Sequence, residues 1–318
     1  MFLYGCQTLL AMLILAPMQG LTEVLFRRVV SRCFPQVFDY AISPFISLTH
    51  GNLHDALKKI DDVLPENNEG CMPVVPQILG KEIEEFVALS NRLYECGFGE
   101  VNWNIGCPMR RVAGKHRGSG ILPYPNEVLA VLDNVVPRMK PRLSVKMRLG
   151  YVHDDEIFKI IPVLNDYPLV NVTIHPRTGK QQYGGIVNLD RFGEVLPLIK
   201  HKVIYNGDIK TLADYERIHT RFPQVEDFMI GRGALQNPLL PATIKGHQVG
   251  VAECRHFIIE LMEEVLRQSI SQEAKVRKMK EYWCLVWHAL PIGEQQARAV
   301  LRTADLAEVY ASIISIVK

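Results

Sequence analysis

The chain has 318 residues, of which 48% are hydrophobic and 22% are charged, and its formal net charge is +2. This composition is that of a globular protein, long enough for one large domain with a small appendage or for two domains. A net charge so close to zero excludes a chain that is basic throughout, so any surface that binds nucleic acid has to be local.

The seven cysteines form no CxxC pair, so neither a zinc site nor a dithiol redox motif is indicated, and we expect no metal. An odd number of cysteines without a regular framework favours the reducing cytoplasm. The apolar run at residues 9–15 resembles the core of a signal peptide, but no Lys or Arg precedes it and it is too short to cross a bilayer. We interpret it as a buried first strand and expect no membrane segment; whether residues 1–10 are a native extension stays open.

Short apolar runs rich in branched residues recur along the first three quarters of the chain. They occupy residues 12–18, 38–45, 72–79, 99–106, 143–150, 169–176, 202–208 and 226–233. Strict alternation of apolar and polar residues is missing from these runs, as expected of parallel strands that are buried on both faces.

Helical patterns separate most of the runs, for example at residues 81–97, 126–136 and 154–167. Eight strands that alternate with helices predict an α/β protein with a (β/α)8 TIM barrel. A doubly wound open sheet is the alternative, but its usual GxGxxG fingerprint after the first strand is missing.

The pattern changes after about residue 245, where only helical periodicity remains. We therefore predict a barrel domain at residues 1–244 and an all-helical domain at residues 245–318. The sequence contains no signal for the oligomeric state.

Chemistry in such a barrel gathers at the carboxyl ends of the strands, and almost every predicted end carries a polar or ionisable residue. In chain order these ends supply Pro17, Met18, Gln19, Gln77, Asn104, Cys107, Lys146, Arg148, His175, Arg177, Asn206, Gly207, Asp208, Gly231 and Arg232. Single residues have structural alternatives: Lys146 can be a paired interior lysine and His175 a satisfied core histidine. Together, the ends indicate a site, and the glycines and Arg232 of the last two ends suggest a phosphate site.

Several stretches resemble the flavin-dependent tRNA-dihydrouridine synthase family, which reduces uridines in tRNA. They are "APMQG", "VPQILG", "NWNIGCP", "SVKMRLG", "TIHPRTGKQQYGG", "VIYNGDI" and "FMIGRGALQNP", in the family's order over residues 16–238. The C-terminal "RKMKEYW" resembles the helical domain of the C-type branch, which acts on uridine 16. The chain departs from the family pattern at Gln19, where an acidic residue is usual, and at Pro176, where glycine is common.

The resemblance implies FMN across the barrel mouth and NADPH or NADH as reductant. Pro17, Met18 and Gln19 would line the flavin ring, Gln77 would hydrogen-bond its edge, Lys146 would lie near N1 and O2, and His175 would approach it. The phosphate would be held by the backbone around Asn206, Gly207, Asp208, Gly231 and Arg232, together with the Arg232 side chain.

Reduction of the uracil C5=C6 bond needs a hydride at C6 and a proton at C5. A thiol with an unperturbed pKa of roughly 8.5 is protonated at neutral pH, so we predict that Cys107 is the general acid. The loop that follows contains glycines for movement and basic residues for RNA phosphates. The target base must leave the tRNA stack, and Asn104 and Tyr183 are the candidates that hold it.

In residues 275–290 an apolar stripe at helical spacing leaves Arg277, Lys278 and Lys280 on the flanks, where they can contact tRNA phosphates or be ordinary solvated charges. Two other functions stay open. One is a barrel flavoenzyme that reduces a small molecule, of the dihydroorotate or enoate type, and the other is a catalytically inactive tRNA-binding protein.

Overall fold

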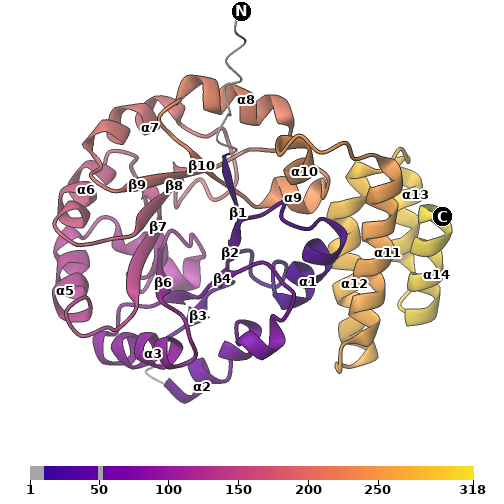
Figure 1. The fold of residues 1–318 in the computed structure, drawn as a ribbon, viewed down its shortest axis with the longest axis horizontal. Helices are drawn as coiled ribbons and strands as arrows, with labels where there is room; N and C mark the ends of the chain where they lie inside the picture. Colours follow the sequence, from indigo (N-terminus) through magenta and orange to yellow (C-terminus); the bar gives the residue numbers. More distant parts are fainter. Residues whose placement is uncertain (1–10, 49–52) are drawn as a thin grey trace, which may run out of the picture.

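The computed structural model describes residues 11–48 and 53–318, so the question about residues 1–10 lies outside the described residues. A ring of parallel strands forms the centre of the molecule (Figure 1). The strands are β1 (Met12–Leu15), β2 (Tyr40–Ile42), β3 (Ile46–Ser47), β4 (Val74–Val75), β5 (Gln77–Leu79), β6 (Glu100–Ile105), β7 (Arg142–Gly150), β8 (Asn171–Thr178), β9 (Lys202–Asn206) and β10 (Asp227–Ile230).

The ring closes because two of its strands are each broken into two pieces. The order of hydrogen-bonded strands is β3-β5-β6-β7-β8-β9-β10-β1-β2-β4. β2 pairs with β4 and β3 pairs with β5, so the two ends of this order join through the chain itself. Pro44 and Pro76 lie at the breaks, where a residue without an N–H group cannot continue the ladder. The eight-stranded barrel predicted from the sequence is therefore confirmed, and the open sheet is wrong.

Helices cover the outside of the barrel (Figure 1). They are α1 (Val24–Cys33), α2 (Leu53–Leu57), α3 (Ile83–Glu95), α4 (Arg110–Ala113), α5 (Pro125–Val135), α6 (Ile157–Asn165), α7 (Leu189–Val195), α8 (Leu212–Arg221), α9 (Arg232–Gln236) and α10 (Leu240–Ile244), with the 3-10 turns η2 (Ile60–Asp62), η3 (Pro65–Asn67), η4 (Gly118–Ile121) and η5 (Leu196–Leu198). Helices α3, α5 and α6 lie where the sequence predicted helices at residues 81–97, 126–136 and 154–167. No helix in residues 11–48 or 53–318 is long and apolar enough to cross a membrane.

The barrel interior changes from apolar to polar along the strands. A small apolar cluster fills it around Ile14, Ile42 and Met229. Residues two apart on a strand share a face, so Lys146 and Arg148 of β7 follow one another on the same side of that strand. β8 repeats this spacing with a histidine and an arginine. The polar side chains therefore gather at the carboxyl ends, where barrel enzymes carry their sites.

After β10 the described chain contains helices only. The C-terminal group comprises α11 (Val251–Arg267), α12 (Gln272–Val286), η6 (Trp287–Ala289), α13 (Glu294–Ala299), η7 (Val300–Arg302) and α14 (Leu306–Val317). The predicted boundary between residues 244 and 245 coincides with the end of α10. The division into two domains stays a prediction.

The C-terminal helices lie beside α1 (Figure 1), and an aromatic cluster joins the two. The ring of Phe257 lies edge-on to Phe26, with 5.9 Å between centroids, and stacks on Phe34 at 5.6 Å. Around this cluster, Arg28 forms an ion pair with Glu264 at 2.7 Å. The aromatic rings bury apolar surface at this contact, and Arg28 supplies the partner of the Glu264 carboxylate, which is buried.

Phe257→Ala should lower the free energy of unfolding by about 3–5 kcal/mol, because the fully buried ring leaves a cavity between α1 and α11. Urea unfolding measures the loss. The matched control is Ile270→Ala, whose side chain is 46% exposed and whose loss should cost less than about 0.5 kcal/mol. Equal midpoints for Phe257→Ala and the wild-type protein would mean that the aromatic cluster does not hold the helices on the barrel.

Candidate active site

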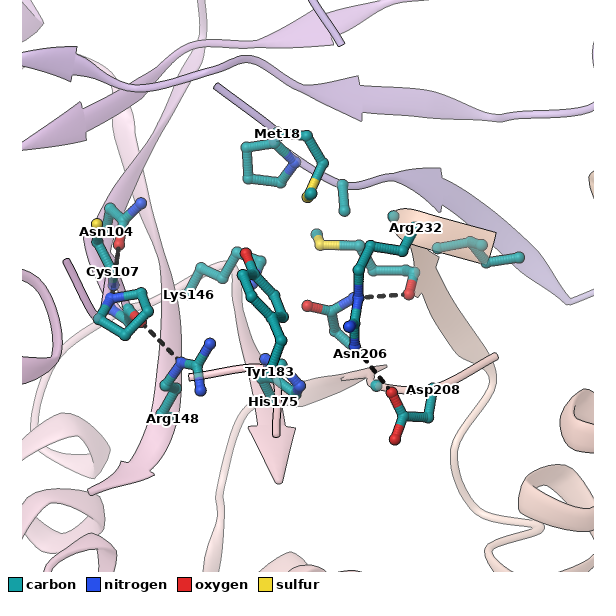
Figure 2. Close-up of a pocket in the computed structure, with 18 of the residues that line it drawn as sticks. Met18, Asn104, Cys107, Lys146, Arg148, His175, Tyr183, Asn206, Asp208 and Arg232 are labelled. Carbon is teal, nitrogen blue, oxygen red and sulfur yellow. Dashed lines mark hydrogen bonds and ion pairs between the residues drawn. The ribbon is translucent and has the colours of Figure 1, made fainter. Parts of the chain in front are cut away.

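A cavity of about 270 Å³ opens at the carboxyl ends of the strands (Figure 2). Most of the residues that the sequence predicted for the site line it. These are Pro17, Met18, Gln19, Asn104, Cys107, Lys146, His175, Tyr183, Asn206, Gly207, Asp208, Gly231 and Arg232. Gln77, Arg277, Lys278 and Lys280 do not belong to the lining, and each is described below.

Cys107 lies in the cavity wall and both polar groups of its backbone are bound. Its N–H donates to Asn104 Oδ1 at 2.9 Å, and the N–H of Gly106 donates to the same oxygen at 3.0 Å. Its carbonyl oxygen accepts from Ser119 Oγ at 3.0 Å. Gly118 has a φ of +54°, and a Cβ at this position would lie 2.6 Å from the Cys107 carbonyl oxygen. The turn η4 therefore packs tightly on the cysteine and fixes where its thiol lies.

The thiol of Cys107 is protonated at neutral pH. Burial raises its pKa above the ordinary value for a thiol, and the hydrogen bond from the Met109 backbone and the charges of Arg148, Arg111 and Lys146 oppose this only in part. A raised pKa keeps the proton on sulfur and lowers the thiolate fraction, so the group is suited to donate a proton and unsuited to attack as a nucleophile.

Asn104 is oriented by a chain of side-chain hydrogen bonds across three strands. Its Nδ2 donates to Gln77 Oε1 at 2.7 Å, Gln77 Nε2 donates to Asn102 Oδ1 at 2.7 Å, and Asn102 Nδ2 donates to Ser144 Oγ at 2.9 Å. Gln77 is fully buried and does not line the cavity. Its contact with a flavin edge stays a prediction; in the structure its amide bonds to Asn102 and Asn104 and so supports Asn104 beneath Cys107.

Lys146 contributes a positive charge without a counterion. Among the described residues, no carboxylate lies within ion-pair distance of its ammonium group. Burial, with a smaller effect of Arg148, lowers its pKa to about 7. An unpaired, desolvated cation that faces a cavity favours a ligand that is anionic or electron-rich beside it.

His175 is neutral and its tautomer is fixed. Arg177 Nη1 lies 3.2 Å from His175 Nε2, and a guanidinium can only donate, so Nε2 accepts and the ring proton lies on Nδ1. Burial and the charges of Arg148, Lys146, Arg177 and Arg232 hold the pKa of His175 well below 6.5. His175 lines the cavity, so its ring can offer the Nδ1–H group to a ligand there.

The loops that follow β9 and β10 pack closely against neighbouring strands. The sequence predicts a phosphate site at these two loops. A Cβ on Gly207 would lie 3.2 Å from His175 Cδ2, and a Cβ on Gly231 would lie 3.2 Å from Ala16 Cβ. The Asp208 carboxylate is occupied by Arg177 at 2.6 Å and Arg232 at 3.0 Å. Backbone N–H groups and the Arg232 side chain can still bind an anion here, Lys210 also lines this end of the cavity, and the short helix α9 begins at Arg232.

Tyr183 lies at the rim between two guanidinium groups (Figure 2). The Arg232 guanidinium carbon is 4.5 Å from the centroid of its ring and that of Arg148 is 5.6 Å away. The ring is 47% exposed, so a ligand in the cavity can stack on it or displace it. Arg148 also donates to the carbonyl oxygens of Thr178 and Gln182, which ties the loop that bears Tyr183 to β7.

The loop that follows Cys107 is packed rather than free, which corrects one expectation. The sequence predicts that glycines let this loop move, but a Cβ on Gly118 would lie 2.6 Å from the Cys107 carbonyl oxygen and one on Gly120 would lie 2.1 Å from that of Ala113, so these two glycines serve close packing. Arg117 is buried and forms an ion pair with Glu82. The basic side chains of this segment that are exposed are Arg110, Arg111 and Lys115.

The basic face predicted on α12 is mostly engaged within the chain. Lys278 donates to the Gly20 carbonyl oxygen and lies 2.9 Å from Glu23 Oε2. Lys280 donates to the carbonyl oxygens of Leu301, at 2.9 Å, and Thr303. Both lysines therefore hold other segments in place, which the sequence did not reveal, and Arg277 is the exposed member of the predicted set.

Two arginines, Arg148 and Arg177, matter more than the sequence suggested. They lie two residues after Lys146 and His175, the spacing that places side chains on one face of a strand, and this signal was available in the sequence. No group of three or more His, Cys, Asp or Glu side chains in the described part of the chain is arranged to hold a metal ion.

Residues 14–304 match the sequence model of a family described as dihydrouridine synthase. A tRNA-dihydrouridine(16) synthase of Neisseria meningitidis serogroup B is 27% identical over 285 residues, which are 85% of this chain and 84% of that protein. A probable tRNA-dihydrouridine synthase of Staphylococcus aureus is 30% identical over 236 residues, 71% of this chain and 69% of that protein. A probable tRNA-dihydrouridine synthase 2 of Bacillus subtilis is 31% identical over 235 residues, with the same coverage.

Solved structures support the barrel. The old yellow enzyme homologue from Zymomonas mobilis matches with a TM-score of 0.54 at 10% identity, covering 72% of this chain and 87% of that chain. Morphinone reductase matches with a TM-score of 0.51 at 12% identity, covering 75% of this chain and 86% of that chain. At such low identity the likeness concerns the fold alone.

Lys146→Met should stabilise the ligand-free protein at pH 7 by about 1–3 kcal/mol, because it removes a desolvated charge. The lowered pKa means that the unfolded chain binds more protons than the native protein above about pH 7. The free energy of unfolding of the wild-type protein should therefore rise relative to that of the variant as pH increases from 7 toward 10. Urea unfolding of both proteins at several pH values measures this difference. If Lys146→Met is less stable than the wild-type protein at pH 7, or if the difference between their free energies of unfolding does not change with pH, Lys146 does not have a lowered pKa.

Proposed function

The chain belongs to the dihydrouridine synthase family, and from that premise we propose that it reduces one uridine of tRNA to dihydrouridine with FMN as cofactor and NADPH or NADH as reductant. The observation that carries the proposal is a protonated thiol, Cys107, in the wall of a cavity that also holds an unpaired ammonium group, Lys146. A small-molecule reductase and an inactive tRNA-binding protein, the other two functions considered, are less consistent with family membership and with this pair of groups.

The cavity fits a flavin mononucleotide at two ends. Lys146 suits the N1 and O2 side of the ring, and Pro17, Met18 and Gln19 form the wall against which the ring would lie. The phosphate would lie where Gly207 and Gly231 allow close approach, beside Arg232. His175 would present its Nδ1–H to the cofactor. A bound flavin, once reduced by the nicotinamide, would supply the hydride that adds to C6 of uracil.

The protein's part in the chemistry is to deliver the proton. When the C6–H bond forms, the electrons of the C5=C6 bond move to C5, which takes the proton from the Cys107 Sγ–H. The S–H bond breaks and a thiolate remains, which water reprotonates before the next turnover. Asn104 and Ser119 fix the position of the cysteine, so the proton is available without rearrangement of the loop.

The substrate site would extend from the cavity to the rim. Tyr183 can stack on the uracil that has left the tRNA stack, and Asn104 faces the cavity although its amide is already bonded within the protein. Phosphates of the tRNA would meet Arg110, Arg111 and Lys115 beside the mouth and Arg277 on α12, which are exposed.

We further propose uridine 16 as the target, because the Neisseria relative named above carries that position in its name. The helical region, residues 245–318, would be the tRNA-binding domain and residues 1–244 the catalytic one. A cytoplasmic location follows from the proposed substrate, since tRNA is modified and used in the cytoplasm.

Cys107→Ala should separate the two half-reactions, which are the reduction of the flavin by NADPH and the reduction of tRNA by the flavin. The variant should retain FMN and be reduced by NADPH at the wild-type rate, because hydride transfer to the flavin does not use the thiol. Its reduction of tRNA should fall by about 10²–10⁴, the usual range for a lost general acid. Mass spectrometry of the tRNA product measures dihydrouridine at each position.

The control is Cys284→Ala, whose thiol is exposed on α12 and should leave both half-reactions unchanged. Full tRNA turnover by Cys107→Ala would mean that the proton comes from another group. Dihydrouridine at a position other than 16 would contradict the assignment of the target but not the chemistry.

A further inference from the structure

The segment from Gly20 to Glu23 connects the cavity wall to α1. Thr22 is fully buried and holds the wall from behind: its Oγ1 accepts from the Met18 N–H at 2.8 Å and donates to the Ala16 carbonyl oxygen at 3.0 Å. The N–H groups of Leu21 and Thr22 return to the Met18 carbonyl oxygen at 2.9 and 3.0 Å. A shift of this segment therefore shifts Pro17 and Met18.

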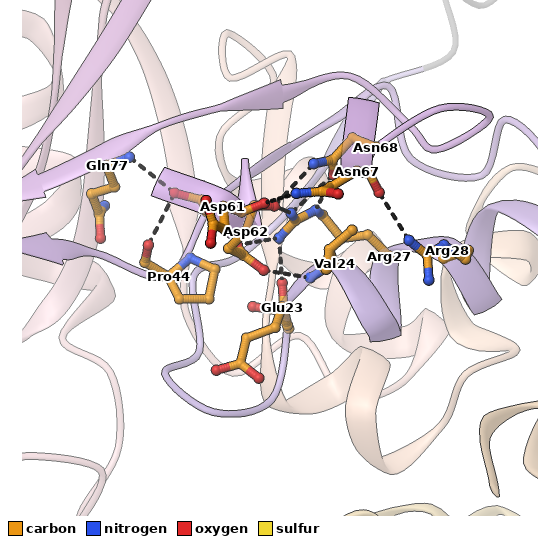
Figure 3. A network of polar contacts seen from close by, with 12 residues as sticks. Glu23, Val24, Arg27, Arg28, Pro44, Asp61, Asp62, Asn67, Asn68 and Gln77 are labelled. Atoms are coloured by element: carbon orange, nitrogen blue, oxygen red, sulfur yellow. Dashed lines mark hydrogen bonds and ion pairs between the residues drawn. The ribbon is translucent and has the colours of Figure 1, made fainter. Parts of the chain in front are cut away.

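One side of the segment is held from within the barrel domain (Figure 3). Arg27, which is fully buried, donates from Nη1 to the Thr22 carbonyl oxygen at 2.9 Å and to Asp62 Oδ2 at 3.0 Å. Asp62 Oδ1 accepts from the Val24 N–H at 2.6 Å, at the start of α1. The segment is thus anchored where it enters the helix.

The opposite side is held by α12 of the C-terminal helices. The Tyr282 hydroxyl donates to the Leu21 carbonyl oxygen at 2.9 Å, and Lys278 donates to the Gly20 carbonyl oxygen and pairs with Glu23. Burial, followed by the charge of Glu23, raises the pKa of Tyr282 well above 10, so the hydroxyl stays a donor. Its ring stacks on Phe26 of α1 at 6.0 Å.

We propose that Tyr282 and Lys278 are positioning residues for the cavity wall, so that α12 sets the affinity for the flavin and the environment of its ring. The proposal rests on the proposed function, because it concerns the cofactor that the wall would contact. It assigns the C-terminal helices a part in the flavin site, in addition to any contact with tRNA. Lys278, which the sequence predicts to contact tRNA phosphates, would instead hold the segment behind the cavity wall.

The chain offers a matched comparison within the same helix. Lys275 of α12 also donates to a backbone carbonyl oxygen, that of Leu266 at 2.6 Å, but Leu266 lies on α11 and not on the cavity wall. Lys278→Met and Lys275→Met therefore each remove a bond from a lysine to a backbone carbonyl oxygen in the same helix, and Lys278→Met also removes the ion pair with Glu23. Tyr282→Phe removes a single hydroxyl and keeps the stacked ring, which makes it the most conservative of the three variants.

The experiment measures three quantities on purified full-length protein: FMN affinity of the apoprotein from flavin fluorescence, the absorption spectrum of the bound flavin, and the melting temperature. Tyr282→Phe and Lys278→Met should each weaken FMN binding by about 2- to 10-fold, the effect of one lost hydrogen bond, and shift the flavin spectrum. Lys275→Met should lower the melting temperature similarly and leave affinity and spectrum unchanged.

Wild-type FMN affinity and spectrum in both Tyr282→Phe and Lys278→Met would overturn the proposal, as would an equal loss of affinity in Lys275→Met, since the effect would then be one of general stability. If Lys278→Met fails to fold, Tyr282→Phe decides the question. A wild-type protein that binds no FMN would contradict the proposed function, whereas normal wild-type binding with unaffected variants contradicts this proposal alone.

Discussion

An excess of desolvated positive charge at the carboxyl end of the barrel is the constraint on which the site depends. Lys146, Arg148, Arg177 and Arg232 converge there, and among the described residues that line the cavity the one carboxylate is that of Asp208. Burial, reinforced by this excess, holds the pKa of His175 well below 6.5 and lowers the pKa of Lys146 to about 7. A folded protein tolerates such an arrangement when an anionic ligand balances it, and the FMN proposed above would contribute both a phosphate and a ring that becomes anionic on reduction.

The same arginines also determine the shape of the site. Arg148 donates to the carbonyl oxygens of Gly106, Thr178 and Gln182, so one guanidinium joins the loop of Cys107 to the loop of Tyr183. Arg177 binds Asp208 and the carbonyl oxygens of Gly184 and Gly185. Because each guanidinium carries five donors in a rigid fork, these residues organise several loops at once, which a lysine could not do.

Much of this arrangement could be predicted from the sequence, for identifiable reasons. The eight apolar runs mark strands buried on both faces, and their polar ends mark the mouth, because parallel strands bring all carboxyl ends to one edge. Contacts between distant segments could not be predicted. Lys278 on the flank of a helix has the same pattern whether it faces solvent or reaches the Gly20 carbonyl oxygen, and Gly120 looks alike in a mobile loop and in a tight packing contact. The hydrogen bonds of Gln77 to Asn102 and Asn104 could not be predicted for the same reason.

The central claim is that Cys107 acts as an acid from the neutral thiol, and the pH dependence of tRNA reduction by pre-reduced enzyme tests it most directly. Burial raises the thiol pKa above its ordinary value, so the single-turnover rate should not rise with pH through the neutral range and should fall only in the alkaline range, as the proton is lost. Cys107→Ala should lack this fall. A rate that rises with pH between 7 and 9 would contradict the account, because it would indicate that the thiolate, and not the thiol, is the active form.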